Sequence, residues 1–134
     1  MDGVTLSDLK QIHHPQGDIY HAVKKSSVGF ENFGEAYFTT INNSETKGWK
    51  KHSKMVLNLI VPTGKVEFVI YNGEKFFTVV LSQENYKRLT ISPNLWVAFR
   101  GLGDKLNLVL NVASIEHDPN EAINIDLEEI NYEW

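Results

Sequence analysis

The sequence has no cysteine among its 134 residues. It therefore offers no disulfide framework, no thiolate nucleophile and no zinc site of the cysteine type. Basic residues are in the minority, because 13 lysines and arginines stand against 17 aspartates and glutamates and give a formal net charge of −4. Nucleic-acid-binding domains normally present a basic face, so nucleic acid is not the partner we expect.

Long hydrophobic runs are also missing. The apolar stretches are no longer than MVLNLIV at 55–61, which is one strand in length and far short of the ~20 residues that span a bilayer. The opening residues, MDGVTLSDLKQIHH, lack the cationic and then apolar pattern of a secretory signal. We therefore expect a cytoplasmic protein without a membrane segment, and its length predicts a single domain over residues 1–134.

Helical periodicity is scarce, and the apolar pattern mostly has a period of two. Turn signals separate the apolar segments, with Pro62-Thr63-Gly64 after one of them and Asn72-Gly73 as a hairpin signal after the next. Many short strands of even spacing favour a sandwich or barrel. We predict an all-β, jelly-roll barrel with strands at 35–41, 55–61, 65–71, 75–81, 88–92 and 106–113.

Two segments are less regular. Ser7 has the side chain of a helix cap and could begin a short turn through Leu9 and Ile12. The segment 121–130, EAINIDLEEI, fits either a last strand or a short helix. We interpret its acidic residues as a solvated face.

The run KGWKKH at 47–52 contains the first candidate for chemistry. In a strand, alternate side chains share a face, so Lys50, His52 and Lys54 point the same way and Trp49 points the opposite way. Histidine can act as a base near neutral pH, and a neighbouring ammonium can stabilise a developing oxyanion. The alternative is a solvated cationic edge strand, in which lysines only prevent aggregation.

This run, with the following PTG and KVEFV, resembles the cupin-type sugar-nucleotide enzymes. These are the dTDP-4-dehydrorhamnose 3,5-epimerases and the WxcM-like dTDP-sugar 3,4-ketoisomerases. The ketoisomerases carry an R-G-x-H-x-H run that residues 47–52 match, and a P-x-x-W element that residues 93–96 match. The turn at 14–17 takes the place of their D-x-R-G turn, and EHDPNEAINIDL at 116–127 is similar to the ending of the epimerases.

The sequence departs from the family pattern at several positions. Lys50 replaces the first histidine of the pair, Gln16 replaces an arginine and Val97 replaces a histidine. Leu57 stands where a metal-binding cupin has glutamate, so the resemblance implies a cupin barrel without a metal or other cofactor.

The resemblance implies an isomerase that acts on a nucleoside-diphosphate 4-keto-6-deoxy sugar in cell-surface polysaccharide biosynthesis. We place epimerisation at C3, C5 or both first, because the first histidine is missing. His52 would remove the proton beside the ketone, Lys50 would stabilise the enolate oxygen and Tyr37, on the preceding strand, would return a proton. The alternatives are a 3,4-ketoisomerase on the same substrate class and a non-catalytic cupin that binds sugar nucleotides; Tyr37 could equally be a packing aromatic.

Five further residues are candidates for substrate binding. Asn58 and Asn111 interrupt apolar strands and would line a polar cavity, unless they mark exposed strand ends. Trp96 could stack on a base or sugar and Arg100 could pair with a pyrophosphate, with ordinary packing as the alternative for the aromatic. Lys54 could reach a phosphate or only solvent.

The remaining histidines form no metal-binding pattern, since His13 and His14 are neighbours that point apart and the others are isolated. The segment 26–34, SSVGFENFG, is interpreted as a loop over the barrel mouth or a dimer contact, because it lacks the pattern of a phosphate-binding loop. By analogy with similar barrels we expect a homodimer.

Overall fold

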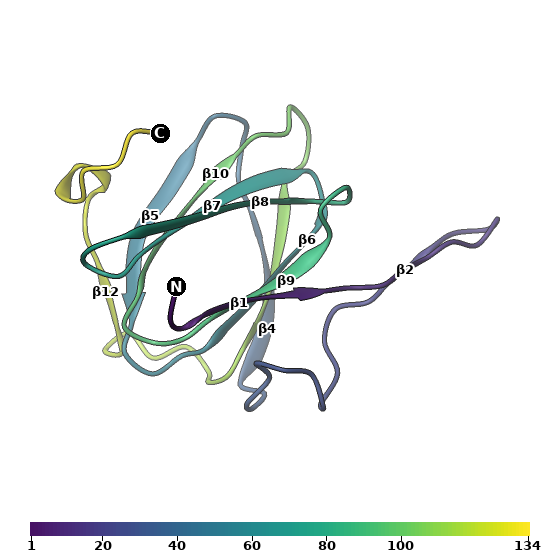
Figure 1. The fold of residues 1–134 in the computed structure, drawn as a ribbon, viewed down its shortest axis with the longest axis horizontal. Coiled ribbons are helices and arrows are strands. Elements are labelled where there is room, and N and C mark those ends of the chain that lie inside the picture. The colour runs from purple at the N-terminus through teal and green to yellow at the C-terminus, as the bar shows by residue number, and fades with distance from the viewer.

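A computed structural model describes all residues from 1 to 134, and nearly all of its regular structure is β-strand. Two five-stranded antiparallel sheets face each other and form a barrel (Figure 1). The first sheet has the order β1 (Val4–Asp8), β9 (Lys87–Ile91), β6 (Leu57–Thr63), β11 (Leu108–Ala113) and β4 (Glu35–Thr40). The second has the order β12 (Ala122–Asn124), β5 (Thr46–His52), β10 (Trp96–Gly101), β7 (Lys65–Tyr71) and β8 (Phe76–Ser82).

The core lies between the inner faces of the two sheets. Val66, Phe68 and Ile70 alternate along β7 and are fully buried, and Leu89 and Ile91 meet them from β9. Burial of apolar surface of this kind contributes about 25 cal/mol per Å² removed from water. The predicted all-β barrel is confirmed, and all six predicted strands are present within a few residues of their expected bounds.

The turn signal at Asn72-Gly73 is confirmed as a hairpin, because β7 and β8 pair antiparallel from Tyr71 and Phe76 outward. The connection has four residues instead of the two that the signal predicts. The Asn72 side chain explains this length, since its Oδ1 accepts the backbone N–H groups of Glu74 (2.9 Å) and Lys75 (2.8 Å).

Two segments differ from the sequence interpretation, and a third combines the two alternatives that it left open. Ser7 lies in β1, paired with Arg88 of β9, and does not cap a helical turn. Residues 96–101 form β10, a central strand of the second sheet, and not a rim. The segment 121–130 contains both expected forms, since β12 is followed by a single 3₁₀ turn, η1 (Leu127–Glu129). No helix in the structure has the length and apolar character needed to cross a membrane.

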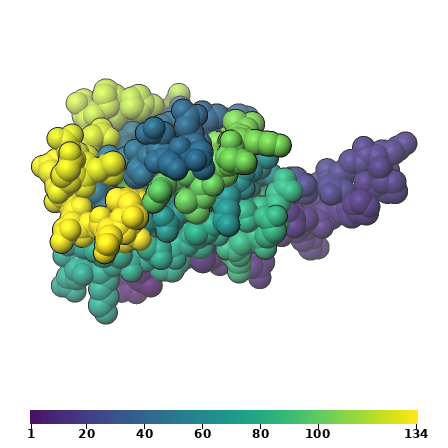
Figure 2. All heavy atoms as spheres, turned by 90° about the horizontal axis from the view of Figure 1, so that it is seen from above, coloured from purple at the N-terminus to yellow at the C-terminus, as the bar shows by residue number.

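A hairpin arm of β2 (Gln11–Ile12) and β3 (Ile19–Tyr20) extends away from the barrel (Figures 1 and 2). It exposes apolar side chains, including Ile12 and Ile19. Exposed apolar residues on a projecting strand pair are typical of contact surfaces. The homodimer stays a prediction, and this arm is where we would look for the contact.

The outer face of the second sheet carries an aromatic cluster. Trp49 of β5 is fully buried there, packs against Trp134 and Tyr132, and donates its indole N–H to the carbonyl of Leu127 (3.2 Å). The backbone groups of Trp49 and Ile125 also bond to each other in both directions. The C-terminal residues, yellow in Figure 2, therefore fix β5 from outside the barrel.

Candidate active site in the barrel cavity

A cavity of about 220 Å³ lies between the two sheets. Its apolar lining includes Leu57 and Leu59 of β6 and Phe68 of β7, which belong to the two facing sheets. The polar side chains of the lining come from β4, β5 and β11, although these strands are not all close to one another in the sequence. These polar side chains are Tyr37, Thr39, Lys47, Lys50, His52 and Asn111.

His52 is the last residue of β5 and is buried, with 8% of its surface exposed. Its ring Nδ1 hydrogen-bonds to the Oε1 of Glu121. Glu121 comes directly before β12, and β12 pairs with β5 so that Ala122 lies opposite His52. The pairing of these two strands therefore brings the carboxylate to the imidazole.

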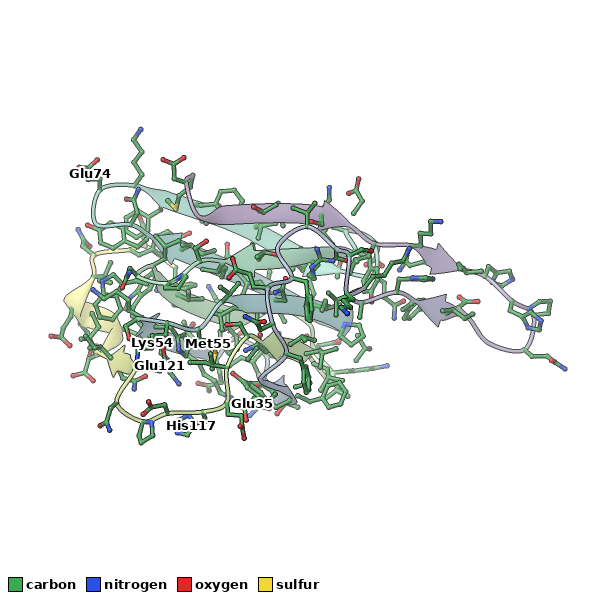
Figure 3. The ribbon with its side chains drawn as sticks, turned by 90° about the horizontal axis from the view of Figure 1, so that it is seen from below. Glu35, Lys54, Met55, Glu74, His117 and Glu121 are labelled. Carbon is green, nitrogen blue, oxygen red and sulfur yellow. The ribbon has the colours of Figure 1, made fainter.

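Glu121 has further partners that fix its charge. Its Oε2 accepts the backbone N–H groups of Lys54 (3.0 Å) and Met55 (3.2 Å), the residues that Figure 3 labels beside it. Burial by itself would raise the pKa of Glu121. The hydrogen bond with His52, the two N–H groups and the attraction to His52 outweigh burial and leave the pKa below its ordinary value.

An ionised Glu121 decides the proton arrangement on His52. A carboxylate only accepts hydrogen bonds, so Nδ1 of His52 must carry a proton. In the neutral ring, Nε2 is then the basic nitrogen, and the ring lines the cavity. The pair thus has the arrangement of an oriented base.

Tyr37 and Asn111 form a second polar pair in the cavity. They lie opposite each other on β4 and β11, and Asn111 donates its Nδ2–H to the phenol oxygen of Tyr37 (2.9 Å). The Asn111 Oδ1 accepts the backbone N–H of Asn58 (3.1 Å), which fixes the orientation of the amide. Because the phenol oxygen accepts here, its own proton remains available for donation into the cavity.

Cations line the same wall as His52. Lys50 precedes it by two residues on the same face of β5, and Lys47 also lines the cavity while its Nζ donates to the carbonyl of Thr40 (2.7 Å). Gly48 lies between these lysines in the sequence. A larger residue would not fit at this position, because its Cβ would come within 2.4 Å of the Ala98 Cβ on β10. Ammonium groups in a mostly apolar cavity interact strongly with any negative charge that develops there.

Two residues that the sequence assigned to the cavity lie elsewhere. Asn58 is on the outer face of β6, where its Oδ1 accepts from Arg88 (3.0 Å) and Thr90 (2.7 Å), while Leu57 and Leu59 line the cavity. The faces of β6 are thus the reverse of the expected ones. Lys54 follows the end of β5 and is exposed outside the cavity lining.

Trp96 and Arg100 also lie outside the cavity. Along β10 the alternation turns Val97 and Phe99 inward, so Trp96 and Arg100 are on the other face. Trp96 packs beside the outer aromatic cluster, under the ammonium of Lys51 at 4.7 Å from its ring centre. Because β10 is a central strand, its successive residues point alternately into the cavity and to the outer face of the sheet. Residues of a rim loop would not have to alternate in this way.

Sequence reasoning missed Glu121 and Lys47 as site residues. Glu121 was placed in a solvated acidic segment, although it is only 5% exposed. The sequence identifies Lys47 only as the counterpart of an arginine in the family motif, and strict alternation would place it on the face opposite to His52. An irregularity in the pairing of β5 with β10 brings it to the same wall. The structure contains no group of three or more histidines, aspartates and glutamates that could hold a metal ion.

Comparisons with known proteins give a consistent result. Residues 2–131 match the family described as FdtA: WxcM-like, C-terminal. The chain is 33% identical to a dTDP sugar isomerase from Desulfovibrio desulfuricans G20, with a TM-score of 0.94 over 99% of this chain and 91% of that one. No curated protein matches.

Two more distant structures share the fold. QdtA, a sugar 3,4-ketoisomerase from Thermoanaerobacterium thermosaccharolyticum solved with TDP, is 22% identical, with a TM-score of 0.81 over 92% of this chain and 88% of that one. The 3,5-epimerase RmlC from Legionella pneumophila Philadelphia 1 is 17% identical, with a TM-score of 0.82 over 95% and 74%. The predicted cupin jelly-roll barrel is therefore confirmed.

Proposed function

Because the chain belongs to the FdtA family of WxcM-like, C-terminal domains, we propose that it is a dTDP-sugar 3,4-ketoisomerase. Its substrate would be a nucleoside-diphosphate 4-keto-6-deoxy sugar, and the reaction moves the ketone from C4 to C3. The sequence analysis placed the 3,5-epimerase first. The family and the named relatives support the ketoisomerase alternative better.

The observation that carries the proposal is the hydrogen bond between His52 and Glu121 at the wall of the cavity. A base that removes a proton from carbon beside a ketone needs a fixed position and a free nitrogen. Glu121 holds the Nδ1–H and leaves Nε2 for the sugar. Glu121 is therefore a positioning residue, and His52 is the proposed catalytic base.

The proton transfers balance without any other reactant. His52 takes the proton from C3, and the electrons of that bond form a double bond between C3 and C4, with negative charge on the former ketone oxygen. A proton passes from the C3 hydroxyl to this oxygen. Protonation of C4 then leaves a carbonyl at C3, so the product is an isomer of the substrate.

Lys50 and Tyr37 have complementary roles in this proposal. The Lys50 ammonium stabilises the negative oxygen, an interaction that is strong in a cavity whose lining includes the apolar side chains of Leu57, Leu59 and Phe68. Tyr37 supplies a proton from the opposite sheet, with its phenol held by Asn111. A charged intermediate between the two sheets would thus meet a base on one side and an acid on the other.

The test follows dTDP-4-keto-6-deoxyglucose with the protein in D₂O by NMR. A ketoisomerase gives a 3-keto product with deuterium at C4. We expect His52→Gln to lower kcat by about 10³-fold, within the range for loss of a general base. The exposed His117 supplies a matched control, because His117→Gln removes the same ring outside the cavity and keeps wild-type turnover.

Two other outcomes would replace the proposal. Exchange at C3 or C5 with the ketone still at C4 would identify an epimerase. Binding without exchange or conversion would identify a non-catalytic sugar-nucleotide-binding protein.

A further inference from the structure

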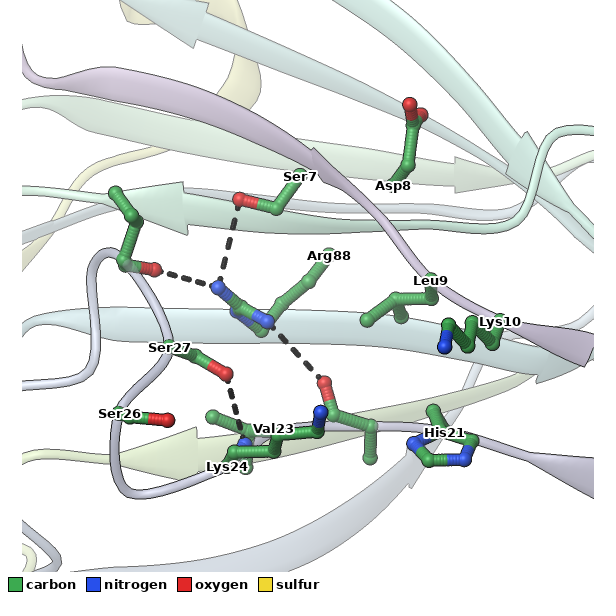
Figure 4. A pocket seen from close by; sticks show the side chains of 12 residues that line it. Ser7, Asp8, Leu9, Lys10, His21, Val23, Lys24, Ser26, Ser27 and Arg88 are labelled. Carbon is green, nitrogen blue, oxygen red and sulfur yellow. Dashed lines mark hydrogen bonds between the residues drawn. The ribbon is translucent and has the colours of Figure 1, made fainter.

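A second cavity, of about 370 Å³, lies on the outer face of the first sheet (Figure 4). Its walls come from β1, β9 and the segment 21–28, which crosses the sheet. Leu89 of β9 points into the barrel core, so its neighbour Arg88 points outward into this cavity. The two cavities share no lining residue.

Positive charge and hydroxyl groups dominate this lining. Arg88, Lys10 and Lys24 contribute three cations, in a chain whose net charge is −4. His21 adds an imidazole, and its backbone N–H donates to the carbonyl of Lys10 (2.9 Å), which holds these two residues side by side. Hydroxyl groups come from Ser7, Ser26 and Ser27.

Arg88 is only 2% exposed, yet all its hydrogen-bond partners are neutral. Its Nε donates to the Asn58 Oδ1 (3.0 Å) and its Nη1 to the carbonyl of Ala22 (3.3 Å). Its Nη2 donates to the Ser7 Oγ (3.4 Å) and to the carbonyl of Val28. These four contacts give each nitrogen of the guanidinium a partner without neutralising its charge, and burial lowers the pKa of Arg88.

The one acid in the lining does not neutralise this guanidinium. Asp8 directs its carboxylate to Lys87, with 2.9 Å between Oδ1 and Nζ, and its side chain is 89% exposed. A buried charge without a counter-charge is costly, and an anion in the cavity would offset that cost.

We propose that this outer cavity is a binding site for a small phosphate-bearing anion, held by Lys10, Lys24 and the serine hydroxyls beside Arg88. Oxyanions of this type accept several charge-assisted hydrogen bonds at once, and this lining offers ammonium and hydroxyl donors together. Figure 4 shows Lys10 and His21 on one side of the guanidinium and Ser26 and Ser27 on the other. The space between them is where the phosphate group would bind.

The probes are inorganic phosphate and pyrophosphate, added to the full chain in a phosphate-free buffer at constant ionic strength. Binding is measured by calorimetry and by amide shifts of residues 21–28 in ¹⁵N NMR spectra. We expect saturable binding that Lys10→Gln with Lys24→Gln weakens at least tenfold. The matched control is Lys65→Gln with Lys105→Gln, which removes the same charge from exposed lysines outside both cavities.

An independent measurement uses the wild-type protein and depends on the buried charge of Arg88. An anion bound beside it stabilises the native state by mass action, so millimolar phosphate, well below the concentrations at which excluded salts stabilise proteins in general, should raise Tm saturably at constant ionic strength. Absence of saturable binding, or equal weakening in both double variants, would overturn the proposal. So would phosphate binding that His52→Gln with Lys50→Gln removes, since that would place the anion in the barrel.

Discussion

Two charged side chains are almost equally buried on opposite sheets, and they differ in what surrounds them. Glu121, 5% exposed, meets an imidazole and two backbone N–H groups. Arg88, 2% exposed, meets only neutral acceptors. The first charge is compensated within the chain and the second is not.

The pKa values of both groups are lowered, and the same direction has opposite meanings. For Glu121 the favourable contacts outweigh burial, so the lower pKa marks a stabilised charge. For Arg88 burial is the cause, so the lower pKa marks a destabilised charge. We infer that burial alone does not show whether a charge is compensated. The groups that contact the charge show it.

The largest effect is expected from breaking the compensated region. Glu121→Ala removes the partner of His52 and leaves the N–H groups of Lys54 and Met55 without an acceptor. We expect kcat to fall by about 10²-fold or more, and the free energy of unfolding to fall by about 3 kcal/mol. Steady-state kinetics and urea unfolding measure the two losses.

The control for that change is Glu128→Ala, which removes an exposed carboxylate from the same C-terminal segment. It should leave kcat unchanged and the free energy of unfolding within about 0.5 kcal/mol of the wild type. Wild-type turnover in Glu121→Ala would contradict the positioning role.

A smaller loss is expected from the uncompensated region. Arg88→Met removes the donors to the carbonyls of Ala22 and Val28, and it also removes a buried charge that lacks a counter-charge. Since the second effect offsets part of the first, we expect the free energy of unfolding to fall by about 2 kcal/mol. A larger loss than in Glu121→Ala, measured in the same urea titration, would indicate that Arg88 has a compensating partner.

Lowering the pH should change the stability contributed by Glu121 but not that contributed by Arg88. The pKa of Glu121 is lower in the folded state than its reference value of 4.5, so its contribution is present above that value and is lost as pH falls through the folded pKa. The wild type should therefore lose more stability than Glu121→Gln between pH 7 and pH 3. Burial lowers the pKa of Arg88, but a guanidinium stays protonated throughout this range. Urea unfolding at several pH values checks this, and parallel curves for the two proteins would contradict it.

The smallest effect concerns a charge next to the outer cavity that stays exposed. Lys87 precedes Arg88 in β9 and pairs with Asp8 at 2.9 Å, with its side chain 34% exposed and that of Asp8 89% exposed. Solvent screens such a pair, so Lys87→Gln should change the free energy of unfolding by less than about 0.5 kcal/mol. A loss near that of Arg88→Met would show that position on the sheet, and not burial, sets the effect.

The period of two predicted much of this molecule correctly. It predicted four of the five strands of the first sheet, missing β1, and it predicted β7 and β8 of the second. It also placed Lys50 and His52 on one face of β5, which is the face that lines the cavity. The same rule misplaced Asn58, because residues 57–61 are buried on both faces of β6 and the apolar pattern then carries no direction. The outer face of β6 can be recognised only in the folded structure, where segment 21–28 covers it and Arg88 lies beneath that segment.

Glu121 was beyond the reach of local pattern. Its meaning depends on a pairing between β12 and β5, across 69 positions of sequence. Without knowledge of that pairing, nothing in the sequence separates Glu121 from the other carboxylates of its acidic segment. Side chains whose environment is set by distant strands are therefore the part of a site that sequence periodicity alone does not give.

The aromatic cluster behind β5 has a spectroscopic consequence. All three tryptophans of the chain, Trp49, Trp96 and Trp134, lie in or beside it, and none lines the barrel cavity. Tryptophan fluorescence, excited selectively over that of tyrosine, is thus a native probe of the outer surface of β5, and a sugar nucleotide in the cavity would not touch any of the three indoles. A change in emission on ligand addition would therefore report that the strand bearing His52 has shifted, and it would do so without a label.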